Sequence, residues 1–260
     1  MSKVISIINQ KGGVGKTTTT KAMALGLAEQ GKHVLAIDLD PQGNLSMGFG
    51  VDAPDDYIGV GSLLNEYTKI RMDDDRPLAD EFLVDVTENI DLMIGNDDLD
   101  TLDISLSAYS EGLFFLDTIL SDIKARYDYI LIDCRPSIGN LTKSALISSD
   151  EIIIPTEPQF YSAKGIQKLL KEIAQIQKRF NPHLRINGVL PTRIDLRTKV
   201  SKKFLTVIEN LFSDQKIYDF IPLSTKIAET SEGADMFTYD PHGQGVCAYR
   251  KFVNDFLKGE

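Results

Sequence analysis

The sequence contains few cysteines and no long apolar run. Its 260 residues include only Cys134 and Cys247, which lack metal-binding spacing and fit a reducing cytoplasm. No run of 18 uncharged apolar residues occurs, so we expect no transmembrane helix and no membrane partner. Because an apolar, strand-like run starts at Val4, we also expect no signal peptide.

Positive charge is scarce as well, but it is unevenly distributed. The net charge is −10: residues 1–120 contain 8 Lys/Arg and 21 Asp/Glu, whereas residues 121–260 contain 20 and 17. Between Lys164 and Lys203, eleven basic residues stand against only Glu172 and Asp195. The acidic average alone argues against nucleic acid as a partner, but this segment predicts a basic face.

The apolar runs alternate between strand and helix periods, and 42% hydrophobic content is enough for a substantial core. We predict buried strands at 4–8, 33–39, 90–94, 129–132, 151–155 and 187–192. We predict helices at 21–30, 62–67, 109–126, 165–180 and 247–257. This order is typical of an α/β fold with a doubly wound, mostly parallel sheet flanked by helices.

The stretch VISIINQKGGVGKTTTT, residues 4–20, joins the first predicted strand to the first helix through a Gly-rich loop. Glycines let backbone N–H groups approach an anion, and the following helix N-terminus adds its positive end. Lys16 would reach the β- and γ-phosphates of a nucleotide, and the Thr17 hydroxyl would bind Mg²⁺. The alternative, a Gly-rich turn without a ligand, fits the flanking strand and helix less well.

The strict P-loop pattern requires glycine where this sequence has Gln10, and a second lysine, Lys11, precedes the paired glycines. KGGVGKTT resembles the deviant Walker A motif of the ParA/MinD superfamily of P-loop ATPases. The resemblance implies ATP and Mg²⁺ as cofactors and an ATP-dependent homodimer in which Lys11 contacts the partner's nucleotide and shares catalysis with Lys16. It implies nucleotide contacts from Lys11, Gly12, Gly13, Val14, Gly15, Lys16, Thr17 and Thr18, and from Pro222 beside the adenine.

Three aspartates stand at the ends of predicted strands, where ligands bind in open α/β sheets. Asp133 ends YDYILI, which has the form of a Walker B strand, and would hold Mg²⁺ through water. The resemblance implies that Asp40 positions or polarises the attacking water and that Asp38 lies nearer the Mg²⁺. A polar D-P-Q-G-N turn without a catalytic role is the alternative. Arg135 stands where the family usually has proline, either as a nucleotide or interface contact or as a substitution that blocks one.

The basic segment TRIDLRTKVSKK follows the 187–192 strand and reads as a turn. Phosphate binding needs several cations on one surface and little base-edge chemistry, so we expect sequence-independent contact with double-stranded DNA. Lys226 stands where the family has a DNA-binding arginine, and Leu223 replaces another arginine. The expected DNA-binding residues are Arg193, Arg197, Lys199, Lys202, Lys203 and Lys226. The lysines of the 165–180 helix suit a solvated face instead.

The resemblance covers residues 1 to about 257 and implies a ParA-type partition ATPase. We expect a single P-loop ATPase domain over 1–260, without an N-terminal helix-turn-helix domain. ATP binding would drive dimerisation and nonspecific DNA binding on the nucleoid. A ParB-like centromere-binding protein would stimulate a weak intrinsic ATPase to segregate a plasmid or chromosome.

Two other classes remain open. A MinD-like ATPase that positions the division site would end in a cationic amphipathic helix. The tail YRKFVNDFLKGE has one apolar side, but Asp255 and Glu260 dilute its positive charge, and it suits core packing better. Metallocluster ATPases of the superfamily need cysteine pairs, which two isolated cysteines do not supply.

Overall fold

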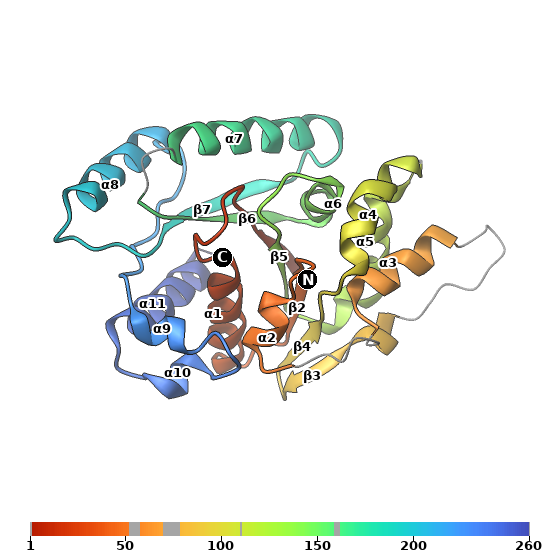
Figure 1. Cartoon of the computed structure of the whole chain (residues 1–260), viewed down its shortest axis with the longest axis horizontal. Helices are drawn as coiled ribbons and strands as arrows, with labels where there is room; N and C mark the ends of the chain where they lie inside the picture. The colour runs from red at the N-terminus through yellow and green to blue at the C-terminus, as the bar shows by residue number, and fades with distance from the viewer. Residues whose placement is uncertain (1, 52–57, 70–78, 110, 159–161, 260) are drawn as a thin grey trace.

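Seven strands form one sheet at the centre of the molecule (Figure 1). The computed structural model describes residues 2–51, 58–69, 79–109, 111–158 and 162–259, without the side chains of 162–164. The strands are β1 (Lys3–Ile7), β2 (Val34–Leu39), β3 (Val84–Thr87), β4 (Ile90–Met93), β5 (Tyr129–Cys134), β6 (Glu151–Thr156) and β7 (Arg185–Pro191). Their order is β3-β4-β2-β5-β1-β6-β7, and every pairing is parallel except β3 with β4.

Both faces of the sheet are buried, as expected for parallel strands between helices. Along β5, Ile130 and Ile132 join one apolar cluster, whereas Tyr129 and Leu131 join the other. The β-branched and aliphatic runs of the sequence therefore supply two cores from alternate residues of the same strands.

Helices cover each face. The α-helices are α1 (Lys16–Glu29), α2 (Asn44–Gly48), α3 (Val60–Lys69), α4 (Asp98–Ser105), α5 (Phe115–Ile123), α6 (Asn140–Ser148), α7 (Ser162–Arg179), α8 (Lys199–Leu211), α9 (Thr225–Glu229), α10 (Met236–Tyr239) and α11 (Gln244–Lys258). The 3-10 turns are η1 (Ala79–Phe82), η2 (Leu106–Ala108), η3 (Gly112–Phe114) and η4 (Lys124–Arg126). Helices α3 to α8 supply one core, and α1, α10 and α11 supply the other.

The predicted α/β class and all six predicted strands are confirmed, but several local predictions were wrong. Helix α1 begins at Lys16 and not at Lys21, because the four threonines that follow Lys16 are themselves helical. The 109–126 segment divides into η3, α5 and η4 instead of one helix. The predicted turn after β7 is helical from Lys199 onward, where Thr198 caps α8 by accepting a bond from Ser201 N. The helix over 62–67 is confirmed as part of α3.

The apolar side of the last helix is used in the core. Phe252, Val253 and Phe256 of α11 are at most 2% exposed and pack with α1 and the sheet. Within the described ranges, no helix combines the length and the apolar character that crossing a membrane requires.

Gly26 of α1 lies directly against Val253 of α11. A Cβ on Gly26 would lie 2.9 Å from Val253 Cγ2 and 3.2 Å from its Cβ. Val253 is β-branched and buried, so it has little freedom to move aside.

We therefore expect Gly26→Ala to reverse the usual benefit of alanine in a helix. Overpacking should lower the free energy of unfolding by about 1–3 kcal/mol. In a Val253→Ala background the added methyl has room, so Gly26→Ala should be neutral or stabilising there. Urea unfolding of the four proteins measures this coupling, and additive effects of the two changes would contradict the packing described.

Candidate functional site

The Gly-rich loop between β1 and α1 has the backbone conformation of an anion cradle. Gly13 and Gly15 adopt φ angles of +77° and +85°, a region that residues with a Cβ rarely enter. Gly15 stands directly before α1, whose first turn starts at Lys16. The loop therefore presents backbone N–H groups and a helix N-terminus toward the same space.

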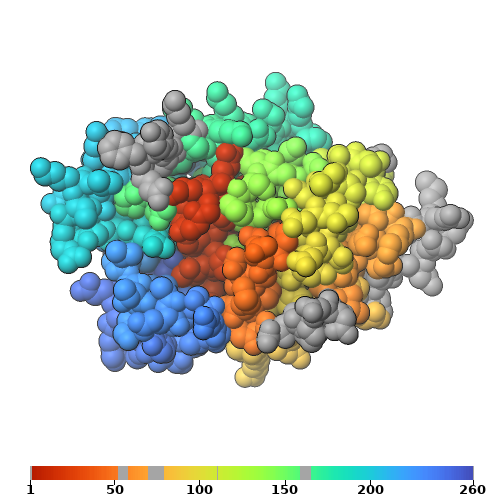
Figure 2. Space-filling view, in the orientation of Figure 1, coloured from red at the N-terminus to blue at the C-terminus, as the bar shows by residue number. Residues whose placement is uncertain are grey.

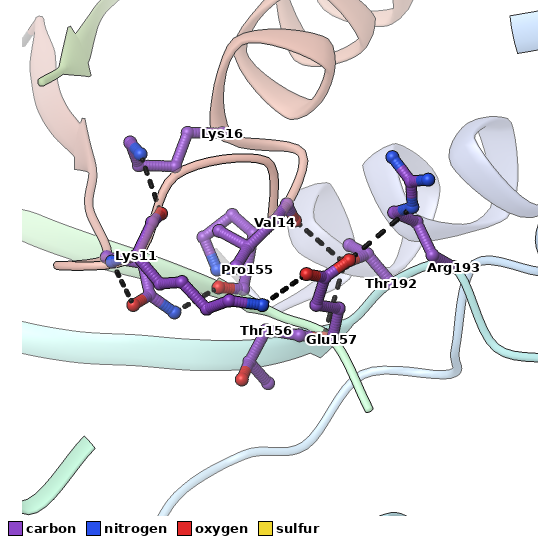
Figure 3. Close-up of polar contacts among 9 residues, drawn as sticks. Lys11, Val14, Lys16, Pro155, Thr156, Glu157, Thr192 and Arg193 are labelled. Carbon is purple, nitrogen blue, oxygen red and sulfur yellow. Dashed lines mark hydrogen bonds and ion pairs between the residues drawn. The ribbon is translucent and has the colours of Figure 1, made fainter. Parts of the chain in front are cut away.

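Two neighbouring strands brace this loop. The Asn9 side-chain amide donates to Pro155 O at 2.7 Å, and its oxygen accepts from Lys11 N at 3.1 Å. Directly after β7, Thr192 donates to Val14 O at 2.8 Å, and its hydroxyl also lies 3.2 Å from Thr156 O (Figure 3). The loop backbone is thus held against the ends of β6 and β7.

Lys16 is almost completely buried at the start of α1. Its Nζ donates to Lys11 O at 3.2 Å across the loop (Figure 3). Burial lowers its pKa, although the nearby Asp133 carboxylate opposes that shift. A desolvated ammonium beside the Gly-rich loop is suited to receive phosphate oxygens.

Asp133 and Asp38 face each other across neighbouring strands at the same edge. They are register partners on β5 and β2, and both side chains are buried. Thr17 donates to Asp133 Oδ2 at 2.6 Å, and Thr20 lies 3.4 Å from Oδ1. Burial raises the pKa of Asp133 well above its usual range, and the Asp38 charge raises it further.

The Asp38 carboxylate organises the loop that carries Asp40. It accepts bonds from Leu45 N, Ser46 N, Ser46 Oγ and Asp40 N, over 2.9 to 3.2 Å. Burial nevertheless raises its pKa to about 6. This geometry gives Asp38 a clear part in orienting Asp40, whereas its nearness to a metal ion stays a prediction.

The residues present fit Mg²⁺ bound together with a nucleotide. A hydroxyl and buried carboxylates are hard oxygen donors, and the repulsion between the two aspartates would fall when a cation enters. In the described residues, no three His, Cys, Asp or Glu side chains gather as a metal site of their own. Mg²⁺ needs only one or two carboxylates when phosphates and water complete its coordination.

A pocket of about 710 Å³ opens over the loop and brings together distant parts of the chain. Figure 2 shows the segment that follows β1, in red, at the surface between the C-terminal segments in blue and the orange segment after β2. The predicted residues that line it are Gly12, Gly13, Gly15, Lys16, Thr17, Thr18, Asp40, Arg193 and Pro222. Val14 is not among the lining residues: its side chain is buried, and its carbonyl accepts from Thr192.

Lys21 also lines the pocket, and our sequence reasoning missed it. Its Nζ donates to Thr230 O at 2.8 Å and Ala234 O at 2.7 Å, which ties α1 to the segment between α9 and α10. Burial lowers its pKa to about 8. The only signal was a lysine at the start of the apolar stretch AMALGLA.

Lys11 lies beside the cradle and pairs within its own chain. Its Nζ contacts Glu157 Oε1, and Arg193 Nε lies 3.4 Å from Glu157 Oε2 (Figure 3). Arg193, expected among the DNA-binding residues, therefore sits at the pocket edge.

The other expected DNA-binding residues are exposed. Lys199, Lys202 and Lys203 occupy the first turns of α8. Arg197 makes two side-chain bonds to Asp195, at 2.9 and 2.8 Å, which lower the pKa of that carboxyl to about 2. Lys226 lies on α9 and pairs with Glu229 at 3.0 Å.

Arg135, whose role the sequence left open, is directed toward α4. Its guanidinium lies 3.1 Å from Asp100 and 3.5 Å from Asp103. Asp103 also accepts from Leu141 N at 2.8 Å, so the pair links the segment after β5 to both α4 and α6.

Replacing one buried aspartate should stabilise the metal-free protein. Because folding raises the pKa of Asp133, the ionised carboxylate lowers the free energy of unfolding, and this loss is complete above the raised pKa. The loss disappears as the pH falls from the raised pKa to the ordinary pKa of a carboxyl group. We expect Asp133→Asn to raise Tm in EDTA at neutral pH by a few degrees, since 1 kcal/mol corresponds to about 2–4 °C in a chain of this size.

The same variant should lose the stabilisation that ATP with Mg²⁺ confers. Thermal melts with EDTA and with ATP and Mg²⁺ measure both effects, and the exposed Asp122→Asn is a matched control. A lower Tm for Asp133→Asn in EDTA would contradict the charge balance described.

Comparison with known proteins agrees with this geometry. A family model described as an AAA domain matches residues 2–186. The sporulation initiation inhibitor protein Soj of Bacillus subtilis is 36% identical over 250 residues, 96% of each chain. The chromosome-partitioning ATPase Soj of Treponema pallidum is 31% identical over 258 residues, 99% of this chain and 98% of that protein.

A solved structure is similar in fold over nearly the whole chain. Cobyrinic acid a,c-diamide synthase from Mycobacterium smegmatis, with bound ADP and magnesium, superposes with a TM-score of 0.83 at 30% identity, over 99% of this chain and 95% of that one. The fold is that of the ParA/MinD-type P-loop ATPases, and the Soj matches extend over nearly the whole chain. This chain therefore belongs to the ParA/Soj family of partition ATPases.

Proposed function

We propose that this protein is an ATP-dependent dimerising switch that binds DNA without sequence specificity and segregates a plasmid or chromosome. In this proposal it works in the cytoplasm on the nucleoid, and a ParB-like centromere-binding protein stimulates its slow hydrolysis of ATP. The observation that carries the proposal is the joint presence of the braced cradle and the second lysine, Lys11, beside it.

In the proposed site, the loop N–H groups and Lys16 hold the phosphates. Thr17 and Asp133 would hold Mg²⁺, which neutralises charge that develops on the phosphates during transfer. Asp40 lines the same pocket on a loop bonded to Asp38, which supports a role for its carboxylate in orienting water. Pro222 borders the far side of the pocket, where the base would lie.

The proposed catalysis is slow until a partner completes it. In the described chain, the Lys11 ammonium pairs with Glu157, whereas the Lys16 ammonium contacts the backbone of the Gly-rich loop. Of these two lysines, therefore, Lys16 is the one positioned for the phosphates within its own chain. A dimer that brings in the partner's Lys11 would add a second cation where negative charge develops.

Proposed DNA binding is supported by lysines at an electrostatically unfavourable position. A helix N-terminus carries positive partial charge and favours anions, yet α8 begins with Lys199, Lys202 and Lys203 and has no acid in its first turn. Such an arrangement becomes favourable when phosphates lie against it. Arg197 is neutralised by Asp195, so it would contribute after that pair opens.

The membrane-switch alternative has less support. A MinD-like protein needs an apolar helix face that can insert into lipid. The apolar side of α11 is already buried against α1 and the sheet, through Phe252, Val253 and Phe256.

Binding to random-sequence duplex DNA should depend on ATP and on salt. We expect binding with ATP and Mg²⁺ but not with ADP or without nucleotide, and its loss in Lys16→Ala. Replacing Lys199, Lys202 and Lys203 together by alanine should flatten the slope of log affinity against log salt by about 3, because each phosphate contact contributes about 0.9. Arg197→Ala should weaken binding for every sequence tested.

Lys124→Ala, an exposed lysine in η4, is the matched control and should bind as the unmodified protein does. No DNA binding in any nucleotide state, with ATP-dependent pelleting on anionic vesicles instead, would reject the partition proposal in favour of the membrane switch.

A further inference from the structure

Glu157 is a carboxylate shared by two cations at the edge of the cradle. It follows β6 directly, and its side chain is only 11% exposed. Lys11 contacts one of its oxygens, and Arg193 lies 3.4 Å from the other. The three residues come from the ends of β1, β6 and β7, which are neighbours in the sheet.

The contact with Glu157 directs the Lys11 side chain away from Lys16. Figure 3 shows the Lys11 side chain extended toward Glu157, whereas Lys16 lies on the other side of the loop. The Lys11 backbone is fixed by Asn9, which is in turn bonded to Pro155 O. Only the side chain therefore has to rotate for the ammonium to leave Glu157.

We propose that Glu157 is a positioning residue that holds Lys11 in its own subunit until ATP-driven dimerisation draws the lysine to the partner. Glu157 then sets how readily the dimer forms. This inference rests on the proposed function, since it requires Lys11 to act in the second subunit.

The second cation makes such a latch reversible. Removing the only partner of a buried carboxylate is strongly unfavourable, because the charge is left uncompensated. Here Arg193 stays beside Glu157 when Lys11 departs. Arg193 has a left-handed backbone with φ of +55°, and its side chain is 58% exposed, so it can follow the carboxylate. Opening the latch therefore costs one ion pair and leaves the carboxylate compensated.

Glu157→Gln tests the latch, because it removes the charge and retains the shape. We would measure the dimer dissociation constant by sedimentation velocity with a slowly hydrolysed ATP analogue and Mg²⁺. A two-fold dimer opens two latches, and a partly exposed pair changes an equilibrium by up to about fivefold, so dimerisation should tighten by roughly 5- to 20-fold.

Glu151→Gln is the matched control. Glu151 pairs with Lys3 at 3.3 Å at the opposite end of β6, so the control should dimerise as the unmodified protein does. In a Lys11→Ala background, Glu157→Gln should have no effect, which a merely structural role would not produce. Thermal melts of all variants establish that they are folded.

The outcomes separate the two proposals. A dimer that forms with the analogue but is unchanged or weakened by Glu157→Gln overturns the latch alone. An unmodified protein that stays monomeric with the analogue overturns the dimerising switch, and the latch with it.

Discussion

Two carboxylates and one ammonium group are buried where β5, β2 and the Gly-rich loop meet, and their charges must be balanced for the site to persist. The Asp38 charge is compensated by four hydrogen bonds, one from the loop before α2 and three from residues of α2. Asp133 is compensated by Thr17 and by the field of Lys16, but not fully, as its raised pKa indicates. A cation at this edge would therefore balance the remaining negative charge, and the loop beside it is suited to an anion.

At the same edge of the sheet, the hydrogen-bonded loop backbone lies beside ion-paired side chains. Asn9 and Thr192 bond the loop backbone to the ends of β6 and β7, so the cradle is braced on that side. Charged side chains around it form ion pairs. Lys11 and Arg193 share Glu157, and Arg197 is held by Asp195. A braced cradle surrounded by ion pairs suits the proposed switch, in which the nucleotide state controls what the protein contacts.

Much of the fold and of the phosphate site could be predicted from sequence. Runs such as 129–132 are β-branched, apolar and short, which identifies buried strands, and the glycine spacing before Lys16 identifies the cradle. Glu157 could not be found in this way. Its importance depends on which strand ends lie side by side, and spacing along the chain does not encode that.

Some predicted helices and strands were wrong or missing because they depend on contacts with the rest of the fold. The basic stretch from Arg193 to Lys203 looked like a turn because it is polar, yet Thr198 caps a helix there and Phe204 and Ile208 anchor it to the core. The short strand β3 was missed because it alternates exposed and half-buried residues at the edge of the sheet.

The most direct test of this account is a crystal structure of the Asp40→Ala variant with ATP and Mg²⁺. The account predicts a dimer in which each Lys11 lies on the partner's phosphates, while Glu157 keeps its pair with Arg193. A nucleotide-bound protein in which Lys11 still contacts its own Glu157, in a monomer or in a dimer, would contradict it.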